Sequence, residues 1–312
     1  MDLKLRVRKT IEEHSLIEKG DRVVLGFSGG PDSLCLLFIL NQLQSVFDFR
    51  LSALHVNHKI RGKAAEEDAA FAREFCEKLG VPFTLVEADV PKLSRELGKT
   101  EEEAGRDVRA EALKKCGADK IALAHNRDDQ AETVLMRIIR GTGVHGLCAM
   151  EYKRADGIIR PLLDAQKSEI LKYCEANGLS PRIDATNSET EYTRNKIRLE
   201  LLPYLKENYN PNMVEALIRL SENASKDDAA LSRIADGIQT NSVKELAALD
   251  EAVFSRVVQR MFKDAGLCED ISAVHINALR SAVLKNYGGK VIEFPHGYIA
   301  EIKKGKVLIK HS

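Results

Sequence analysis

The chain has 312 residues, of which 44% are hydrophobic, and this length and apolar content suffice for two domains with separate cores. Its 47 lysines and arginines balance 47 aspartates and glutamates, which excludes a strongly basic coat for nucleic acid but leaves room for a local basic face. Six scattered cysteines without a CxxC pair, and the lack of a signal-peptide core or a long apolar run, predict a soluble, cytoplasmic protein with reduced thiols and no membrane partner.

The first predicted elements are a helix over residues 3–17, a buried strand over 23–27 and a core helix through the apolar residues 34–40. Between the strand and the second helix lies a turn of serines, glycines, proline and aspartate. Glycines allow backbone angles that bring main-chain N–H groups close to a ligand, and proline suits the first position of a helix. The helix start therefore directs free N–H groups, with serine hydroxyls beside them, into an anion site. The residues of this predicted site are Ser28, Gly29, Gly30, Pro31, Asp32 and Ser33.

The turn matches neither the GxxxxGK[ST] phosphate loop, because no lysine follows its glycines, nor the GxGxxG dinucleotide motif. The simplest alternative is a serine–glycine turn that only caps a helix. With a strand before it and Asp32-Ser33 after it, however, the turn resembles the pyrophosphate loop of the ATP pyrophosphatase (PP-loop) family. That resemblance implies ATP binding at residues 28–33 and cleavage of ATP to AMP and pyrophosphate.

Three more strands alternate with helices further along the chain. The strands are predicted over 51–56, 83–86 and 121–124, and the helices between them over 64–79 and 100–117. This alternation favours an α/β fold with a doubly wound, Rossmann-like parallel sheet. In such sheets ligands bind at the carboxyl ends of the strands, where this chain carries its polar clusters.

The segment that follows the fourth of these strands carries carboxylates at the predicted pocket. Asn126 or Asp128 is suited to cap the helix that begins there. Asp128, Asp129 and Glu132 then share its first turns. Acidic residues also stabilise a helix start through its dipole, which is the simpler interpretation of the cluster taken alone. Opposite a nucleotide loop, the carboxylates become candidates to hold Mg²⁺ or an amine substrate.

A cluster of cations lies near residue 196, within a predicted helix. Arg194, Lys196 and Arg198 fall within five residues, and Arg137 and Arg140 add positive charge earlier in the sequence. One interpretation is a solvated helical face. The other is contact with the phosphates of a nucleic acid, for which all five residues are candidates.

Asn210-Pro211 marks a change in the pattern, so we expect a domain over residues 1–210 and a second region over 211–312. The second region begins with a long helix over 213–234 and continues with helices over 242–286. Three strand-like segments close the chain, at residues 290–294, 298–302 and 307–310. The prediction is a linker helix followed by a small α+β domain without a catalytic constellation.

Several motifs between residues 20 and 210 together narrow the resemblance. The most specific are DDQAET followed by RGTG, and TRNKIR followed by LLP, and they resemble the tRNA(Ile)-lysidine synthase family. One departure is Asn126, at a position where members of that family often have a second histidine. The resemblance implies that ATP adenylates O2 of the wobble cytidine in a CAU anticodon, and that the amine of free lysine then displaces AMP from C2.

The same resemblance implies roles for the residues already named. Asp32, Asp129 and Glu132 are the candidate catalytic residues. Asp32 and Asp129 are candidates to hold Mg²⁺, while Asp129 and Glu132 are candidates to bind lysine and to assist loss of its proton. The expected partners are tRNA(Ile), which the C-terminal domain helps to grip, free lysine, and a second copy of the chain in a homodimer.

Three other functions remain alternatives at this stage. A tRNA thiolase of the same loop family would call for a persulfide-forming cysteine or a cluster-binding CxxC, and the sequence has neither pattern. An ammonia- and ATP-dependent amide synthetase would not need the basic cluster or the C-terminal domain. A nucleotide-binding regulator without turnover would leave the acidic cluster unexplained.

Overall fold

The computed structural model describes residues 2–60, 62–182, 193–267 and 270–311. The chain divides into two compact units, Met1–Ser221 and Glu222–Ser312. The division falls inside helix α11 (Met213–Asp236), after the boundary at residue 210 that the sequence suggested. Each unit has a hydrophobic core of its own.

A five-stranded sheet organises the first unit. Its strands are β1 (Arg22–Gly26), β2 (Arg50–Asn57), β3 (Phe83–Glu87), β4 (Lys120–Ala122) and β5 (Ile158–Ile159). Their order is β3-β2-β1-β4-β5, and every neighbouring pair is parallel. The predicted doubly wound α/β fold is therefore confirmed. Because the strand order reverses between β1 and β4, the segments that follow these two strands meet at the place where such folds bind ligands.

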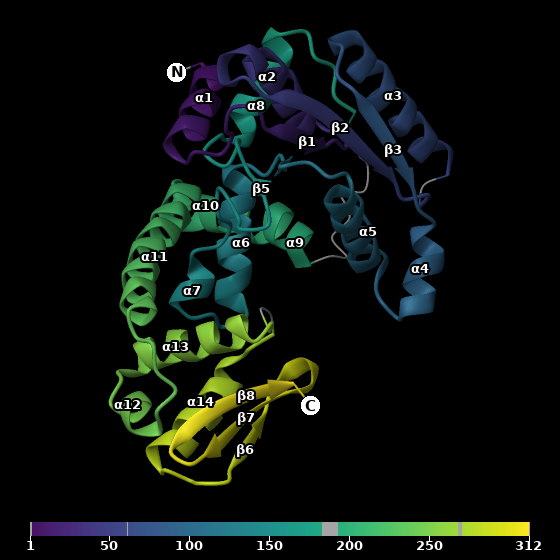
Figure 1. Ribbon diagram of the computed structural model, residues 1–312. Coiled ribbons are helices and arrows are strands. Elements are labelled where there is room, and N and C mark those ends of the chain that lie inside the picture. The colour runs from purple at the N-terminus through teal and green to yellow at the C-terminus, as the bar shows by residue number, and fades with distance from the viewer. Residues whose placement is uncertain (1, 61, 183–192, 268–269, 312) are drawn as a thin grey trace. The chain divides into compact units, whose positions relative to one another are not determined.

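Helices cover both faces of this sheet (Figure 1). The helices of the first unit are α1 (Leu3–Glu13), α2 (Pro31–Phe47), α3 (Lys63–Leu79), α4 (Val90–Leu97), α5 (Glu101–Lys115), α6 (Arg127–Ile139), α7 (Val144–Leu147), α8 (Lys167–Ala176), α9 (Thr193–Lys196) and α10 (Leu202–Asn208), with a π-helix, η2 (Ile197–Leu201), between the last two. Residues from α1, α2, α3 and α8 join one core with Leu25 and Phe27, whereas Val24 and Leu54 pack with α5 on the opposite face. This alternation follows from the two-residue period of a strand.

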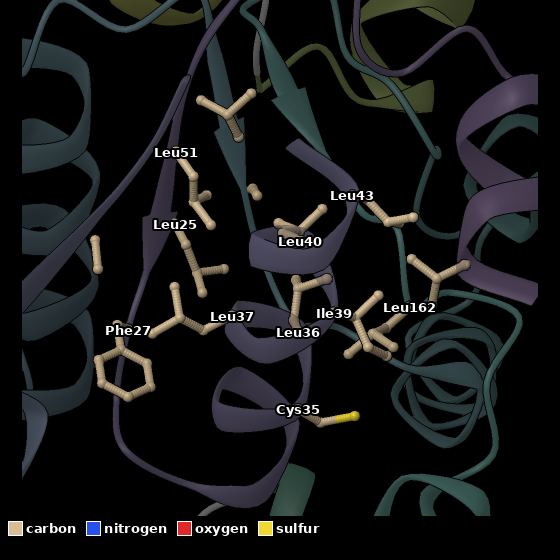
Figure 2. Close-up of a cluster of buried hydrophobic side chains, with 14 of the residues drawn as sticks. Leu25, Phe27, Cys35, Leu36, Leu37, Ile39, Leu40, Leu43, Leu51 and Leu162 are labelled. Carbon is tan, nitrogen blue, oxygen red and sulfur yellow. The ribbon is translucent and has the colours of Figure 1, made fainter. Parts of the chain in front are cut away.

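Helix α2 is the centre of the larger core. Leu36, Leu37 and Leu40 are completely buried, and Figure 2 shows them close to Leu25 of β1 and Leu51 of β2. An all-round apolar helix of this kind is stable only when other elements surround it. The core therefore holds the N-terminus of α2 rigidly at the end of β1.

Local sequence signals explain where several helices begin and end. The capping box of Thr100 and Glu103 is present at the start of α5, as predicted. Helix α6 is capped by Asn126 rather than Asp128. The predicted helix over residues 3–17 ends earlier, at Glu13, because Ser15 has a left-handed backbone angle (φ 46°). Left-handed angles are incompatible with continuing a right-handed helix.

The described residues of the second unit form the remainder of α11, three further α-helices, the 3₁₀ helix η3 (Pro295–Gly297) and an antiparallel sheet. These elements are α12 (Val243–Ala247), α13 (Glu251–Asp264), α14 (Ala273–Leu284), β6 (Val291–Glu293), β7 (Tyr298–Lys303) and β8 (Lys306–His311). Phe262 and Phe294 stack in its core with ring centroids 3.9 Å apart. The predicted small α+β region is thus confirmed. Among the described residues of the whole chain, no helix combines the length and the apolar character needed to cross a membrane.

Candidate functional site

The turn between β1 and α2 is a tight loop closed by its own serines. Ser28 Oγ and Ser33 Oγ lie 3.0 Å apart, and Ser33 Oγ also donates to the Gly30 carbonyl at 3.1 Å. Gly29 has a φ of +80°, a backbone conformation that favours glycine. The backbone at the start of α2 is consequently held in place, as an anion site at a helix N-terminus requires. The Ser33 hydroxyl, however, already makes hydrogen bonds within the loop.

Asp32 lies in the first turn of α2 and is held from two sides. Its Oδ1 accepts a hydrogen bond from Asn126 Nδ2 at 3.0 Å, and its Oδ2 lies 2.5 Å from Lys167 Nζ. The side chain is 26% exposed. The carboxylate is thus neutralised by a lysine and stays accessible to solvent.

Asn126 connects the loop to the acidic helix α6. Its side chain accepts a hydrogen bond from the N–H of Asp129 at 3.0 Å, while Asp129 Oδ2 accepts one from the Asn126 N–H at 3.0 Å. The Asn126 amide group also reaches Asp32. Asn126 therefore has a defined structural role here, since its amide oxygen accepts from Asp129 and its amide nitrogen donates to Asp32.

Asp129 and Glu132 form a compact cluster with two arginines from the segment after residue 192. Arg198 donates from Nε to Glu132 Oε1 at 2.6 Å and from Nη2 to Asp129 Oδ1 at 2.8 Å. Arg194 reaches the same two carboxylates at 3.1 Å each. We call these four residues the arginine–carboxylate cluster. Glu132 is only 2% exposed, so its charge is compensated almost entirely within the protein.

Charge and burial have opposite effects on Arg198. Burial disfavours its charged form, but the hydrogen bonds and negative charge of Glu132 and Asp129 outweigh burial and raise the pKa of Arg198. The guanidinium therefore stays charged at every physiological pH. Two positive and two negative groups then balance within the cluster.

His125, in the segment between β4 and α6, is neutral near pH 7. Burial, assisted by the positive charge of Arg160 and opposed by Asp129, lowers the pKa of His125 to about 4. Arg160 Nε donates a hydrogen bond to His125 Nδ1 at 3.2 Å. The accepting Nδ1 places the imidazole proton on Nε2. A neutral imidazole of this kind adds no repulsion to the cations around the site.

A cavity of about 190 Å³ joins the loop to the cluster. Asp32, Asp128, Glu132, Lys167 and Arg198 are among the residues that line it. Of the acidic residues predicted to share one pocket, Asp32, Asp128 and Glu132 line this cavity, whereas Asp129 and the other loop residues are not among its lining residues. Among the described residues, no group of three His, Cys, Asp or Glu side chains is arranged to hold a metal ion by itself. Two carboxylates completed by substrate phosphates are nevertheless a donor set that suits Mg²⁺.

The remaining basic candidates lie in different environments. Arg137 donates to the Gly146 carbonyl at 2.6 Å, and burial lowers the pKa of Arg137. Arg140 is exposed and caps the end of α6, and Lys196 is exposed on α9. Arg194 and Arg198 point to carboxylates, which the helical-face interpretation from sequence did not foresee, because that interpretation took no account of packing against α6.

Comparisons with known proteins identify the family. Residues 2–205 match the PP-loop domain family. The tRNA(Ile)-lysidine synthase of Clostridioides difficile is 40% identical over 97% of this chain and 70% of its own length. The enzyme of the same name from Clostridium acetobutylicum is 41% identical over 97% of this chain and 69% of its own.

The chain belongs to the tRNA(Ile)-lysidine synthase family. It is accordingly a ligase of the PP-loop type that uses ATP. A solved structure of the U34-tRNA thiolase NcsA from Methanococcus maripaludis superposes with a TM-score of 0.57, at 24% identity, over 71% of this chain and 77% of that one. That likeness shows a shared fold.

In this member of the lysidine synthase family, sequence reasoning missed Lys167. It is the first residue of α8, where a positive charge opposes the helix dipole. This unfavourable position was the sequence signal that could have identified Lys167, since a cation at a helix start requires carboxylates nearby to compensate its charge. The compensation comes from Asp32, and Asp128 accepts a hydrogen bond from the Lys167 N–H at 2.8 Å.

Proposed function

We propose that this protein joins lysine to C2 of the wobble cytidine in the CAU anticodon of tRNA(Ile). In the first step ATP adenylates O2 of the cytidine and pyrophosphate leaves. In the second step the lysine ε-amine attacks C2 and AMP leaves. The observation that carries the proposal is a cavity lined both by Asp32 of the PP-loop and by Glu132, a carboxylate that binds cations. The names of the relatives support the choice of tRNA and lysine as substrates.

The loop is the proposed binding site for the phosphates of ATP. Free N–H groups at the start of α2, in a loop fixed by Ser28 and Ser33, stabilise negative charge on the α-phosphate and the leaving pyrophosphate. Asp32 and Asp129 would hold Mg²⁺, which supplies positive charge that neutralises these phosphates. Asn126 fits this role because it contacts both carboxylates and so fixes their spacing.

The arginine–carboxylate cluster is the proposed site for lysine. Asp129 and Glu132 already bind two guanidinium groups, so this pair of carboxylates is built to accept cations. An ammonium group placed there would exchange with one arginine. The carboxylate nearest the ε-amine would then take up the proton that the amine must lose before it attacks.

The proposed tRNA contacts are Arg194, Lys196, Arg198, Arg137 and Arg140, together with the C-terminal unit. Lys196 and Arg140 are the most accessible of the five. The hairpin between β7 and β8 adds exposed lysines at 303, 304 and 306. Phosphate contacts of this kind would position the tRNA without reading its sequence.

Cys35 offers no support for sulfur transfer. Cys35 lies in the first turns of α2 but is completely buried, and its contact with Cys174 together with burial raises the pKa of Cys35. A thiol in that state is a poor nucleophile. No cysteine is among the residues that line the cavity.

The deciding experiment measures pyrophosphate and AMP release from ATP by purified protein. Unmodified tRNA(Ile) with a CAU anticodon and lysine are supplied together, and each is then omitted in turn. The proposal expects pyrophosphate release to require tRNA and AMP release to require lysine as well. Pyrophosphate release without tRNA, or AMP release with ammonia in place of lysine, would instead indicate an amide synthetase. No release under any condition would indicate a nucleotide-binding regulator.

A further inference from the structure

The loop of this protein lacks the lysine that a GxxxxGK[ST] phosphate loop carries in its own sequence, but the fold brings one to it. Lys167 Nζ lies 2.5 Å from Oδ2 of Asp32, which follows the loop residues Gly30 and Pro31. The two residues are 135 positions apart in the sequence. The cation that other phosphate loops provide locally is here provided by α8.

The position of Lys167 is fixed at its backbone and open at its side-chain end. Its N–H donates to Asp128 Oδ2 at 2.8 Å, and Gln166 and Glu169 form a capping box that sets the start of α8. The side chain is 38% exposed and lines the cavity. An ammonium group has three donors, so the contact with Asp32 leaves capacity for further oxygen acceptors.

Other cations at the cavity are less suited to the phosphates at the loop. Arg198 makes three hydrogen bonds to Asp129 and Glu132. Lys206 lines the cavity from α10. Among the lysines and arginines of the described chain that line this cavity, Lys167 is the one whose ion pair joins it to the loop.

We propose that Lys167 binds the β- and γ-phosphates of ATP and stabilises the leaving pyrophosphate. The choice of cytidine as the attacking group rests on the function proposed above. As O2 of the cytidine forms its bond to the α-phosphorus, the bond from that phosphorus to the oxygen bridging to the β-phosphate breaks. The electron pair of that bond leaves on pyrophosphate, where negative charge increases. Lys167 keeps its proton throughout and acts through its charge and its hydrogen bonds.

The test compares the binding of ATP, pyrophosphate and AMP, each with Mg²⁺, to the whole chain and to Lys167→Met and Lys167→Arg. Loss of a hydrogen bond to a charged group predicts that Lys167→Met binds ATP and pyrophosphate about ten- to a hundredfold more weakly. AMP lacks the β- and γ-phosphates, so its affinity should stay the same. Lys167→Arg should recover most of the lost affinity. Lys172→Met, at an exposed position on the same helix, is the matched control.

Two outcomes would overturn the proposal. Equal weakening of AMP, ATP and pyrophosphate would mean that Lys167 only supports the loop, and unchanged binding of all three would make it merely the counterion of Asp32. Because the pattern across ligands is compared within one variant, a general loss of folded protein does not imitate the expected result. The binding assay contains neither tRNA nor lysine, so it succeeds or fails independently of the proposed ligase reaction.

Discussion

The loop around Asp32 and the arginine–carboxylate cluster hold negative charge in different ways within one cavity. Asp32 is 26% exposed and is neutralised by a lysine and an amide. Glu132 is 2% exposed and is held by two arginines. An accessible carboxylate exchanges its partners at little cost, whereas a buried one that loses its partner becomes an uncompensated charge. The difference suggests that the loop is suited to binding metal and phosphate, and the cluster to positioning a cation.

The largest expected effect comes from Asp32. Asp32→Ala should slow pyrophosphate release by about a hundred- to a thousandfold, because the site loses a charge that orders both Lys167 and the proposed metal. Pyrophosphate release with tRNA(Ile) present is the measurement. Asp156→Ala is a control, since Asp156 also pairs with a cation but lies outside the cavity. If Asp32→Ala kept its turnover, Asp32 would not be a ligand of the proposed metal.

The second test separates the two reaction steps at Glu132. Glu132→Gln should reduce lysine attachment about tenfold more than adenylation, because it weakens a charged contact to the lysine amine. Single-turnover rates of AMP and pyrophosphate release report the two steps separately. Glu12→Gln, which removes the carboxylate that pairs with Arg8 on α1, is the control. Equal losses in both steps would contradict the role proposed for Glu132.

The cations at residues 194–198 allow a comparison between those that pair with carboxylates and the exposed Lys196. Lys196 is exposed, so Lys196→Gln should weaken tRNA binding and reduce the slope of log affinity against log salt by about one. Arg198→Gln should change that slope less if Arg198 keeps its carboxylate partners in the complex. Binding titrations at several salt concentrations measure both slopes. An unchanged slope for Lys196→Gln would show that Lys196 belongs to a solvated helical face and does not contact tRNA phosphates.

The smallest expected effect is a pH dependence of stability caused by His58. Burial, reinforced by Arg109, lowers the pKa of His58 from its ordinary 6.5 to about 4. Between these two values the unfolded chain binds the proton more readily than the folded one, so stability is complete above pH 6.5 and falls as the pH drops toward 4.

Urea unfolding at pH 7 and pH 5 measures this dependence. Because the side chain is partly exposed, we expect a loss of about 1 kcal/mol from His58 on going to pH 5. His58→Gln should show a correspondingly smaller loss over the same interval. An identical loss in the variant would show that another group causes the dependence.

The amino-acid sequence by itself determined the strands, most helices, the loop and the acidic start of α6. These features depend on residues within a few positions of one another. Glycine at Gly29 suits the positive φ of the turn, Thr100 and Glu103 cap α5 reciprocally, and apolar periodicity marks the buried faces. Alternation of strands and helices then restricts the topology to a parallel sheet.

Only the tertiary structure decided which charges meet. Lys167 reaches Asp32 across 135 positions, and Arg198 reaches Glu132 across 66. In the sequence these lysines and arginines resemble any solvated helical face, because a side chain's partner depends on how its helix packs against others. The order of strands at the β1–β4 switch point and the packing against α6 bring the loop, Lys167 and the arginine–carboxylate cluster to one cavity.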